Sequence, residues 1–409
     1  MKRWLLAVSV VGACSSGSAA PREVERPDAS TPVQPADAGL DAKTDAQVID
    51  AARVDAAAVD ARVVVEDAEV EASAPSACPA STPPMLGTDR YVANTGKTAV
   101  DALRYTNVGA SGAYAQVIDG WSKATGCVGD SDGSLCRTKY RKPKQVSGAL
   151  APFDEDMTLV FGGPIELYRI GIYSPRNGGW ARDAYWDRCG TQGLVFAGNK
   201  HWYECAGFVE SYVSADGTKE SAQPVQFAGS IAAGTEVHVN SDGLCTDPES
   251  CGWSGGLPLR GFSGDADGSK MFVVELRMPL GDKTPAYWIL PSQVVRSSQY
   301  GCNCRGQGSD ATYKGGCGEL DVAEILGGVT TSLEATTTLY SFQDITGGGS
   351  VTFARPVNES ALFVVIFDAP SRQIAIRRLP HGAFDFASRA ADSFVAEALT
   401  NPGTVRALR

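Results

Sequence analysis

Three carboxylate side chains, those of Glu319, Asp321 and Glu324, lie close together in one short segment of the chain. The residues between and just after them are apolar and favour a β-strand: Leu320, Val322, Ile325 and Leu326. Three acids on one face of a strand are costly as part of a hydrophobic core. They suit an active site with a nucleophile, a helper carboxylate and a general acid.

The spacing of the three acids predicts an irregular strand. In a regular strand Glu319 and Asp321 share one face, and Glu324 points to the other. One extra residue, a β-bulge around Val322–Ala323, returns Glu324 to the first face. We therefore predict a bulge there, because bulges re-aim side chains next to active sites.

The start of the chain indicates export. Lys2 and Arg3 precede the apolar run 4–13, which is too short to span a bilayer and is typical of a signal peptide. The run ends in 11–14, Val-Gly-Ala-Cys, which resembles a bacterial lipobox. The resemblance implies cleavage after residue 13, lipidation of Cys14 and, because Ser15 follows, an outer-membrane or cell-surface lipoprotein. The alternative is an ordinary secreted protein with a free Cys14.

The segment 14–85 differs in composition from the rest of the chain. Asp recurs every few residues, mostly followed by Ala, with Pro and Val between. The segment holds most of the net charge of −11. Such a composition buries too little apolar surface to offset chain entropy, so we expect a disordered, extended tether.

The region 86–409 is close to charge balance, which argues against nucleic acid as a partner and suits a neutral polysaccharide. It is rich in Gly and in short alternating apolar runs, which predicts an all-β fold, an antiparallel β-sandwich. The expected strands include 159–161, 167–173, 271–278, 335–342 and 361–367. We divide the region into a small N-terminal part, 86–150, a sandwich domain, 151–390, and a C-terminal tail, 391–409. One helix is expected around 384–399.

Cysteine usage agrees with export. Ten cysteines remain when Cys14 is set aside, an even number in an oxidising compartment. Close spacing predicts the disulfide pairs Cys127–Cys136, Cys189–Cys205 and Cys245–Cys251. We expect Cys302 or Cys304 to pair with Cys317, which leaves the other for Cys78 or a distant partner.

We predict no metal and no cofactor. The cysteines 302, 304 and 317 are poorly spaced for zinc. The three histidines, His201, His238 and His381, are too scattered for a Ser-His-Asp or Cys-His site. The segment 265–268 resembles the start of a calcium loop but lacks the later ligands, so a turn is expected.

The motif Glu319-x-Asp321-x-x-Glu324 resembles the active-site signature of family 16 glycoside hydrolases, which are jelly-roll sandwiches of the laminarinase and lichenase type. Residues 285–291, Pro-Ala-Tyr-Trp-Ile-Leu-Pro, resemble that family's Pro-Ala-aromatic-Trp strand, and 272–279 resemble the strand before it. A closer similarity is to fungal cell-wall proteins of the Tos/YJL type, described as endo-β-1,3-glucanases. The segments that carry it are 147–155, 163–167, 212–218, 302–304 and 316–319, within the range 105–379.

The resemblance implies a concanavalin-like jelly roll and a retaining mechanism. Glu319 is the expected nucleophile and Glu324 the acid and base. Asp321 between them would orient Glu319 and raise the pKa of Glu324. The His-x-Tyr strand that follows the acids in common family 16 enzymes has no counterpart here, and residues 339–342 stand in its place.

Aromatic side chains are the expected sugar platforms, because an indole ring packs on the apolar face of a pyranose. Trp288 is equally compatible with a sugar platform and with a core position. For each of Trp180, Trp186 and Trp253 a core position is the more common outcome.

Three functions remain open at this stage. The first and favoured one is a monomeric endo-acting β-1,3-glucan hydrolase. The second is a transglycosylase of the same fold. The third is a non-catalytic glucan-binding surface lipoprotein, which the intact trio of acids disfavours, since a lectin does not need it.

Overall fold

The computed structural model describes residues 99–117, 141–199, 210–246, 257–297, 316–346, 351–401 and 403–408. These residues form mainly β-strands, and only two helices occur among them. The predicted all-β sandwich is therefore confirmed. The predicted signal peptide, Cys14 and the tether lie outside the described residues.

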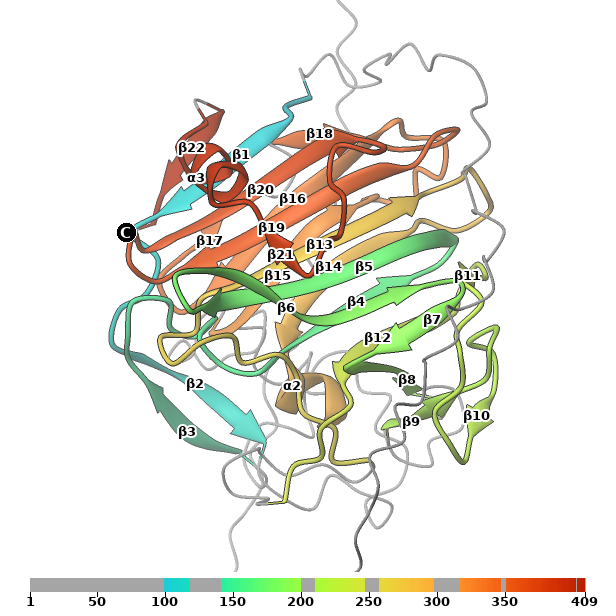
Figure 1. The fold of residues 1–409 in the computed structure, drawn as a ribbon, viewed down its shortest axis with the longest axis horizontal. Coiled ribbons are helices and arrows are strands. Elements are labelled where there is room, and N and C mark those ends of the chain that lie inside the picture. The colour runs from blue at the N-terminus through green and yellow to red at the C-terminus, as the bar shows by residue number, and fades with distance from the viewer. Residues whose placement is uncertain are drawn as a thin grey trace, which may run out of the picture. The chain divides into compact units, whose positions relative to one another are not determined.

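The first sheet forms one layer of the sandwich (Figure 1). In spatial order its main strands are β21 (Arg389–Ala390), β6 (Gly179–Asp187), β5 (Ile165–Arg176), β13 (Lys270–Arg277), β19 (Ala361–Asp368), β20 (Gln373–Pro380), β1 (Ala102–Thr106) and β22 (Thr404–Ala407). Two short strands extend it, β11 (Ser230–Ile231) beside β5 and β7 (Gly190–Gln192) beside β6. The pair β1–β22 is parallel, and the other pairs are antiparallel.

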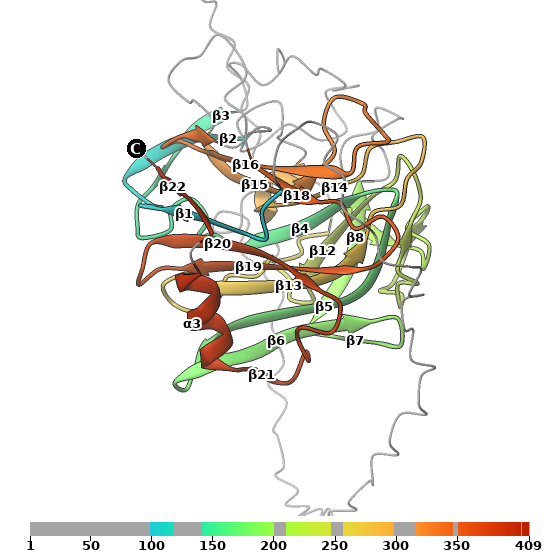
Figure 2. The ribbon, with the colours of Figure 1, turned by 90° about the horizontal axis from the view of Figure 1, so that it is seen from above.

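The second sheet forms the opposite layer, and Figure 2 shows the two layers edge on. In spatial order its main strands are β10 (Glu220–Ser221), β9 (Glu210–Val213), β8 (Leu194–Asn199), β12 (Glu236–Ser241), β4 (Met157–Gly162), β14 (Ala286–Pro291), β15 (Cys317–Glu324), β16 (Glu334–Ser341) and β17 (Ile345–Thr346). The strand β18 (Thr352–Ala354) also pairs with β16.

The main hydrophobic core lies between the two sheets. On β13, Phe272, Val274 and Leu276 belong to this core, whereas Met271 and Val273 belong to a cluster on the outer face of the first sheet. Both faces of the strand are therefore buried, which explains why its sequence is almost continuously apolar.

The outer face of the first sheet is covered by the C-terminal part of the chain, including the helix α3 (Asp392–Thr400) (Figure 2). The helix expected over 384–399 is shorter than predicted. Arg389 and Ala390 instead pair with β6, so their backbone groups belong to the sheet. Phe386 has a φ of 56°, which a right-handed helix does not allow.

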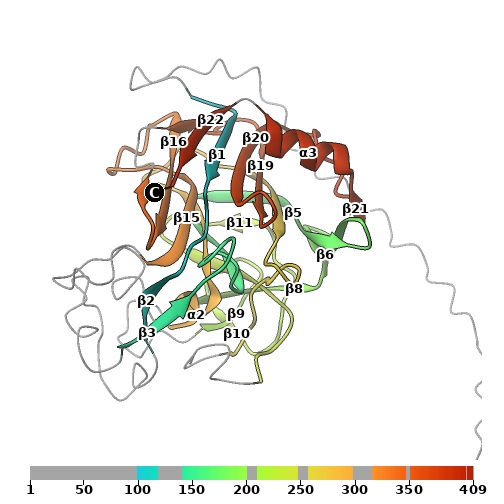
Figure 3. The same cartoon turned by 90° about the vertical axis from the view of Figure 1, so that its left-hand side faces the viewer.

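A two-stranded hairpin, β2 (Gly112–Val117) and β3 (Arg141–Val146), lies beside the helix α2 (Ser292–Ser297) (Figure 3). Tyr114 of β2 packs in one cluster with Val294 and Val295 of α2 and with Cys317 of β15. The region 86–150 thus contributes β1 to the first sheet and this hairpin to the outer side of the second. The tail 391–409 contributes α3 and β22. Neither helix of the described residues has the length and apolar character of a membrane-spanning segment.

Candidate active site

The three acids lie on β15, an interior strand of the second sheet between β14 and β16. Glu319 and Asp321 are buried, and Glu324 is half-buried. A central strand is held by hydrogen bonds on both sides, so it places these side chains more rigidly than a loop would.

The strand β15 carries the predicted bulge. Asp321 lies opposite Trp288 of β14, and Ala323 lies opposite Tyr287, the next residue on that strand. Two steps along β15 thus match one step along β14, and Val322 is the extra residue. The register with β16 shifts in the same interval.

The bulge puts the three acids on one face. Leu320 and Val322 belong to the core between the sheets, and so do Ala323 and Ile325 after the bulge. Alternation along the strand therefore directs Glu319, Asp321 and Glu324 to the outer face of the second sheet. We call this outer face the acid face.

Hydroxyl-bearing side chains of β16 face the acids across the strand pair. Tyr340 lies opposite Glu319, Thr338 opposite Asp321 and Thr336 opposite Glu324. These three residues alternate with the core residues Ala335 and Leu339, so they share the acid face. Tyr340 belongs to the segment that stands in place of the usual His-x-Tyr strand.

Trp288 lies on the acid face next to Asp321. It packs against the outer cluster of the second sheet, not in the core between the sheets. The indole covers Gly162 of β4, where an added Cβ would lie 3.4 Å from Cζ3 of the ring. Trp288 is half-buried, so part of it remains accessible to a ligand.

The other predicted platforms do not join the acids. Trp186 is fully buried in the core, with its ring centre 5.3 Å from that of Phe196 and 6.1 Å from that of Phe227. Trp180 packs on the outer face of the first sheet, on the other side of the molecule. Trp186 therefore has no accessible surface in this fold, and Trp180 does not face the acids. Trp253 lies outside the described residues.

A buried polar network on the acid face was missed by sequence reasoning. His238 of β12 is fully buried, with Nδ1 3.2 Å from Oε1 of Glu210 and Nε2 2.9 Å from Oε1 of Glu236. Asn240 donates to the same Glu210 oxygen at 2.7 Å. In the sequence, Glu236, His238 and Asn240 alternate with Val237 and Val239, which indicates that the three polar side chains share one face of a strand. Their common partner Glu210 is distant in sequence, so the network itself could not be predicted.

The two glutamates keep His238 charged. Burial alone lowers the pKa of the imidazole, but its hydrogen bonds to Glu210 and Glu236 and the negative charges of these two residues outweigh that effect and raise the pKa to about 9. Both ring nitrogens then carry protons at neutral pH and donate to the two carboxylates. The network is thus a buried cation held between two anions.

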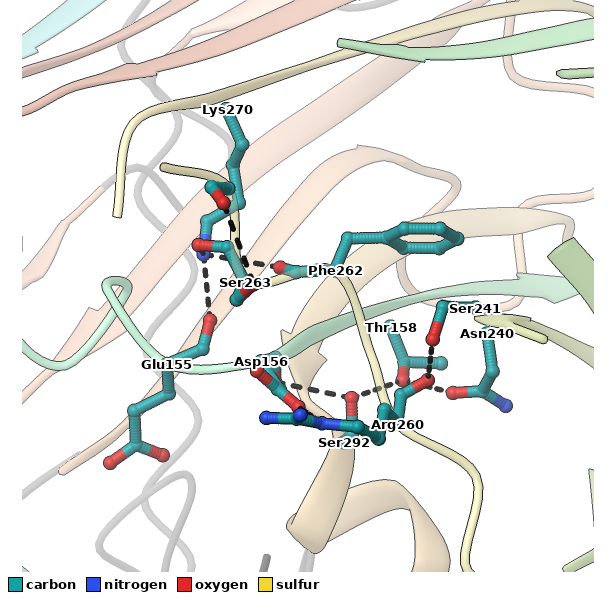
Figure 4. Close-up of polar contacts among 11 residues, drawn as sticks. Glu155, Asp156, Thr158, Asn240, Ser241, Arg260, Phe262, Ser263, Lys270 and Ser292 are labelled. Carbon is teal, nitrogen blue, oxygen red and sulfur yellow. Dashed lines mark hydrogen bonds and ion pairs between the residues drawn. The ribbon is translucent and has the colours of Figure 1, made fainter. Parts of the chain in front are cut away.

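The network continues from β12 through β4 to the start of α2 (Figure 4). Thr158 donates to the side chain of Asn240 and lies 2.7 Å from the hydroxyl of Ser292. Ser292 donates to the backbone oxygen of Asp156 at 3.1 Å, and Arg260 pairs with the Asp156 carboxylate at the same distance. These contacts tie the strands of the acid face together at this end of β4.

Lys270 fixes the chain beneath this segment (Figure 4). Its buried ammonium group donates to the backbone oxygens of Glu155, Phe262 and Ser263 at 2.7, 3.3 and 3.0 Å. Burial lowers the pKa of this lysine to about 8, and the nearby carboxylates oppose that effect. We assign it a structural role, since all three contacts are to backbone oxygens.

The hairpin β2–β3 borders the acid face near the start of β15. Tyr114 donates to Oε2 of Glu155 at 2.8 Å, and Lys144 pairs with Oε1 of the same residue at 2.7 Å. An added Cβ on Gly316 would lie 2.5 Å from Cβ of Tyr114, so only a glycine allows this close approach. The hairpin is thereby packed directly against the chain that enters β15.

Three of the predicted disulfide cysteines, Cys189, Cys245 and Cys317, fall within the described residues. The partner expected for each lies outside them, as do Cys78, Cys127 and Cys136, so the pairings stay predictions. Within the described ranges, no group of three His, Cys, Asp or Glu side chains has an arrangement that could hold a metal ion.

Two family models match the chain. The family described as "Cell wall protein YJL171C/Tos1, C-terminal" matches residues 178–398, and its N-terminal counterpart matches residues 101–175. The chain belongs to the YJL171C/Tos1 cell wall protein family. The N-terminal match ends at residue 175, near the end of β5, and the C-terminal match begins at residue 178, just before β6. The three acids lie within the C-terminal match.

Three relatives with curated names come from Candida albicans and Saccharomyces cerevisiae. The chain is 27% identical over 288 residues to the Candida albicans protein named "Probable circularly permuted 1,3-beta-glucanase PGA52". This alignment covers 62% of the present chain and 69% of the relative. The chain is 32% identical over 218 residues to the C. albicans protein named "Probable circularly permuted 1,3-beta-glucanase TOS1", covering 47% of this chain and 44% of the relative. The Saccharomyces cerevisiae protein of the same name is 29% identical over 252 residues, which are 57% of this chain and 52% of the relative. The chain thus spans about half the length of the two TOS1 proteins, and no solved structure matches it.

Proposed function

We propose that this protein is a retaining endo-β-1,3-glucan hydrolase. The observation that carries the proposal is the bulged strand β15, which directs Glu319, Asp321 and Glu324 to one face of the sheet. The relatives named as 1,3-beta-glucanases support the substrate class.

The chemistry needs two carboxyl groups in different protonation states. The Glu319 carboxylate attacks the anomeric carbon, and the bond to the leaving oxygen breaks as Glu324 donates its proton to that oxygen. Water then attacks the glycosyl-enzyme, gives a proton back to Glu324 and releases Glu319. Asp321 lies between them in sequence, and its negative charge disfavours ionisation of Glu324, which keeps the acid protonated.

The surroundings of the acids suit a neutral sugar chain. Trp288 offers an apolar ring surface beside Asp321, and the hydroxyl groups of Thr336 and Tyr340 border the acids from β16. Pyranose rings have an apolar face that packs on an indole and hydroxyl groups that exchange hydrogen bonds. No resident metal or cofactor enters this mechanism.

The site of action follows from the N-terminal sequence and from the family. The lipobox-like residues 11–14 and the description of the family as cell wall proteins support export and attachment at the cell surface. The enzyme would then act as a monomer on cell-wall or storage β-glucan, with the membrane contacted only through a lipid on Cys14.

Product analysis tests the proposal. Purified protein is incubated with laminarin, a β-1,3-glucan, and in parallel with β-1,4- and β-1,6-glucans, with and without acceptor oligosaccharides. We expect internal cleavage of laminarin alone, with release of β-configured products. Chain extension with acceptors would instead identify a transglycosylase. Binding without cleavage of any glucan would overturn the proposal in favour of a lectin-like role.

A further inference from the structure

A second carboxylate lies on the same transverse row of the acid face as Glu324. Glu324 is opposite Ala286 of β14, Ala286 is opposite Gly162 of β4, and Gly162 is opposite Glu236 of β12. The row crosses four neighbouring strands, β15, β14, β4 and β12, in straight register (Figure 1).

The middle of this row carries the smallest side chains. Gly162 has no side chain and Ala286 has only a methyl group, and both residues are half-buried on the acid face. The next row contains His238, Val160, Trp288 and Asp321. The indole of Trp288 lies over Gly162 and occupies the space above that residue. We call the row from Glu236 to Glu324, with this indole over its middle and a carboxylate at each end, the lane.

The length of the lane exceeds one sugar ring. Three strand spacings of about 4.8 Å separate the backbones of β12 and β15, or roughly 14 Å. A sugar at Glu236 is therefore not one of the two that flank the bond broken beside Glu324. It belongs to the same chain only if that chain crosses the strands along the lane.

The carboxylate of Glu236 is both partly accessible and fixed in orientation. The side chain is 30% accessible, while Oε1 is fixed by the buried Nε2 of His238. The second ring nitrogen of His238 is held by Glu210, which Asn240 also contacts. A carboxylate already fixed in one rotamer loses little conformational entropy when it accepts hydrogen bonds from vicinal hydroxyl groups.

We propose that Glu236 binds a sugar residue of the β-glucan at a distal subsite, and that His238 is the positioning residue that orients its carboxylate. This inference rests on the proposed function and adds a subsite to it. It makes the enzyme prefer long chains, since only they reach both ends of the lane.

Chain-length dependence tests the inference. The isosteric variant Glu236→Gln and the variant His238→Gln are compared with the wild type on a laminari-oligosaccharide series from the disaccharide to the octasaccharide. We expect each variant to raise KM for the longest substrates about tenfold or more, the effect of one lost charge-assisted hydrogen bond. KM for the shortest cleaved substrate, and kcat for all substrates, should stay within about twofold of the wild-type values. Glu397→Gln, at an exposed position of α3 on the outer side of the other sheet, is the matched control.

The outcomes separate the two proposals. Equal losses for short and long substrates, or wild-type behaviour of Glu236→Gln with every length, would overturn the distal subsite and leave the hydrolase assignment in place. If His238→Gln folds poorly, Glu236→Gln decides alone, because its side chain reaches the surface. Absence of β-1,3-glucan cleavage and binding by the wild type would overturn both.

Discussion

Trp288 lies directly opposite Asp321 across the β14–β15 pair, at the point where the register of that pair shifts. The bulge therefore does two things at once. It returns Glu324 to the face of the other acids, and it sets the acids beside the indole that covers Gly162. A sugar stacked on Trp288 would lie next to the carboxylates that act on its bond.

Replacing Trp288 tests the platform. Trp288→Ala should raise KM for laminari-oligosaccharides about tenfold, because stacking contributes on the order of 1.4 kcal/mol. Trp288→Phe keeps a flat ring and should retain most of the affinity. Steady-state kinetics and far-UV circular dichroism separate lost binding from lost folding. Equal effects of Ala and Phe in folded protein would argue against stacking at this position.

Glu319→Gln should abolish turnover of laminarin while leaving the fold and glucan binding nearly intact. The amide has the shape of the carboxylate but cannot form the glycosyl-enzyme. The measurement is reducing-sugar release, with thermal unfolding and calorimetric binding of a hexasaccharide as checks. Glu397→Gln is the control at an exposed glutamate on α3 and should behave as wild type. Wild-type turnover by Glu319→Gln would remove Glu319 from the nucleophile position.

The strands were predictable because their apolar runs are short and rich in residues that favour β-structure. The runs 271–278 and 361–367 correspond to β13 and β19, and the runs 159–161, 167–173 and 335–342 to β4, β5 and β16. The bulge was predictable as well, since acids spaced by two and then by three residues can share a face only if the strand gains a residue.

The parts that sequence could not predict depend on long-range packing. Trp180 and Trp186 lie on one strand, β6, yet they join clusters on opposite faces of the first sheet, because the register of β5 and β6 shifts between them. Trp288 joins a third cluster, on the outer face of the second sheet. Alternation in the sequence does not say which cluster a tryptophan joins. The pairing of His238 with Glu210 depends on which strands carry them to one face. The lane between Glu236 and Glu324 depends on registers across four strands, which no local pattern encodes.

The charged His238 should make stability depend on pH. Its folded-state pKa of about 9 lies above the unfolded value of about 6.5, so its contribution is complete below about pH 6.5 and is lost as the pH rises through 9. The free energy of unfolding of the wild type, minus that of His238→Gln, should fall by on the order of 3 kcal/mol over this interval. Urea unfolding of both proteins at several pH values gives this difference, and Lys270, which titrates in both, cancels. A flat difference would show that His238 is not charged in the folded protein.

Glu324→Ala separates the acid and base from the nucleophile. Hydrolysis of laminarin should slow by several orders of magnitude, because the sugar leaving group needs a proton. An aryl glycoside of a β-1,3-linked glucose oligosaccharide has a good leaving group that needs little protonation, so the glycosyl-enzyme should still form. It should then persist, because no base activates the attacking water. Azide needs no base and should restore turnover, giving a β-glycosyl azide after two inversions at the anomeric carbon. An α-glycosyl azide, or rescue of Glu319→Ala in place of Glu324→Ala, would mean that the two glutamates have exchanged roles or that the enzyme inverts.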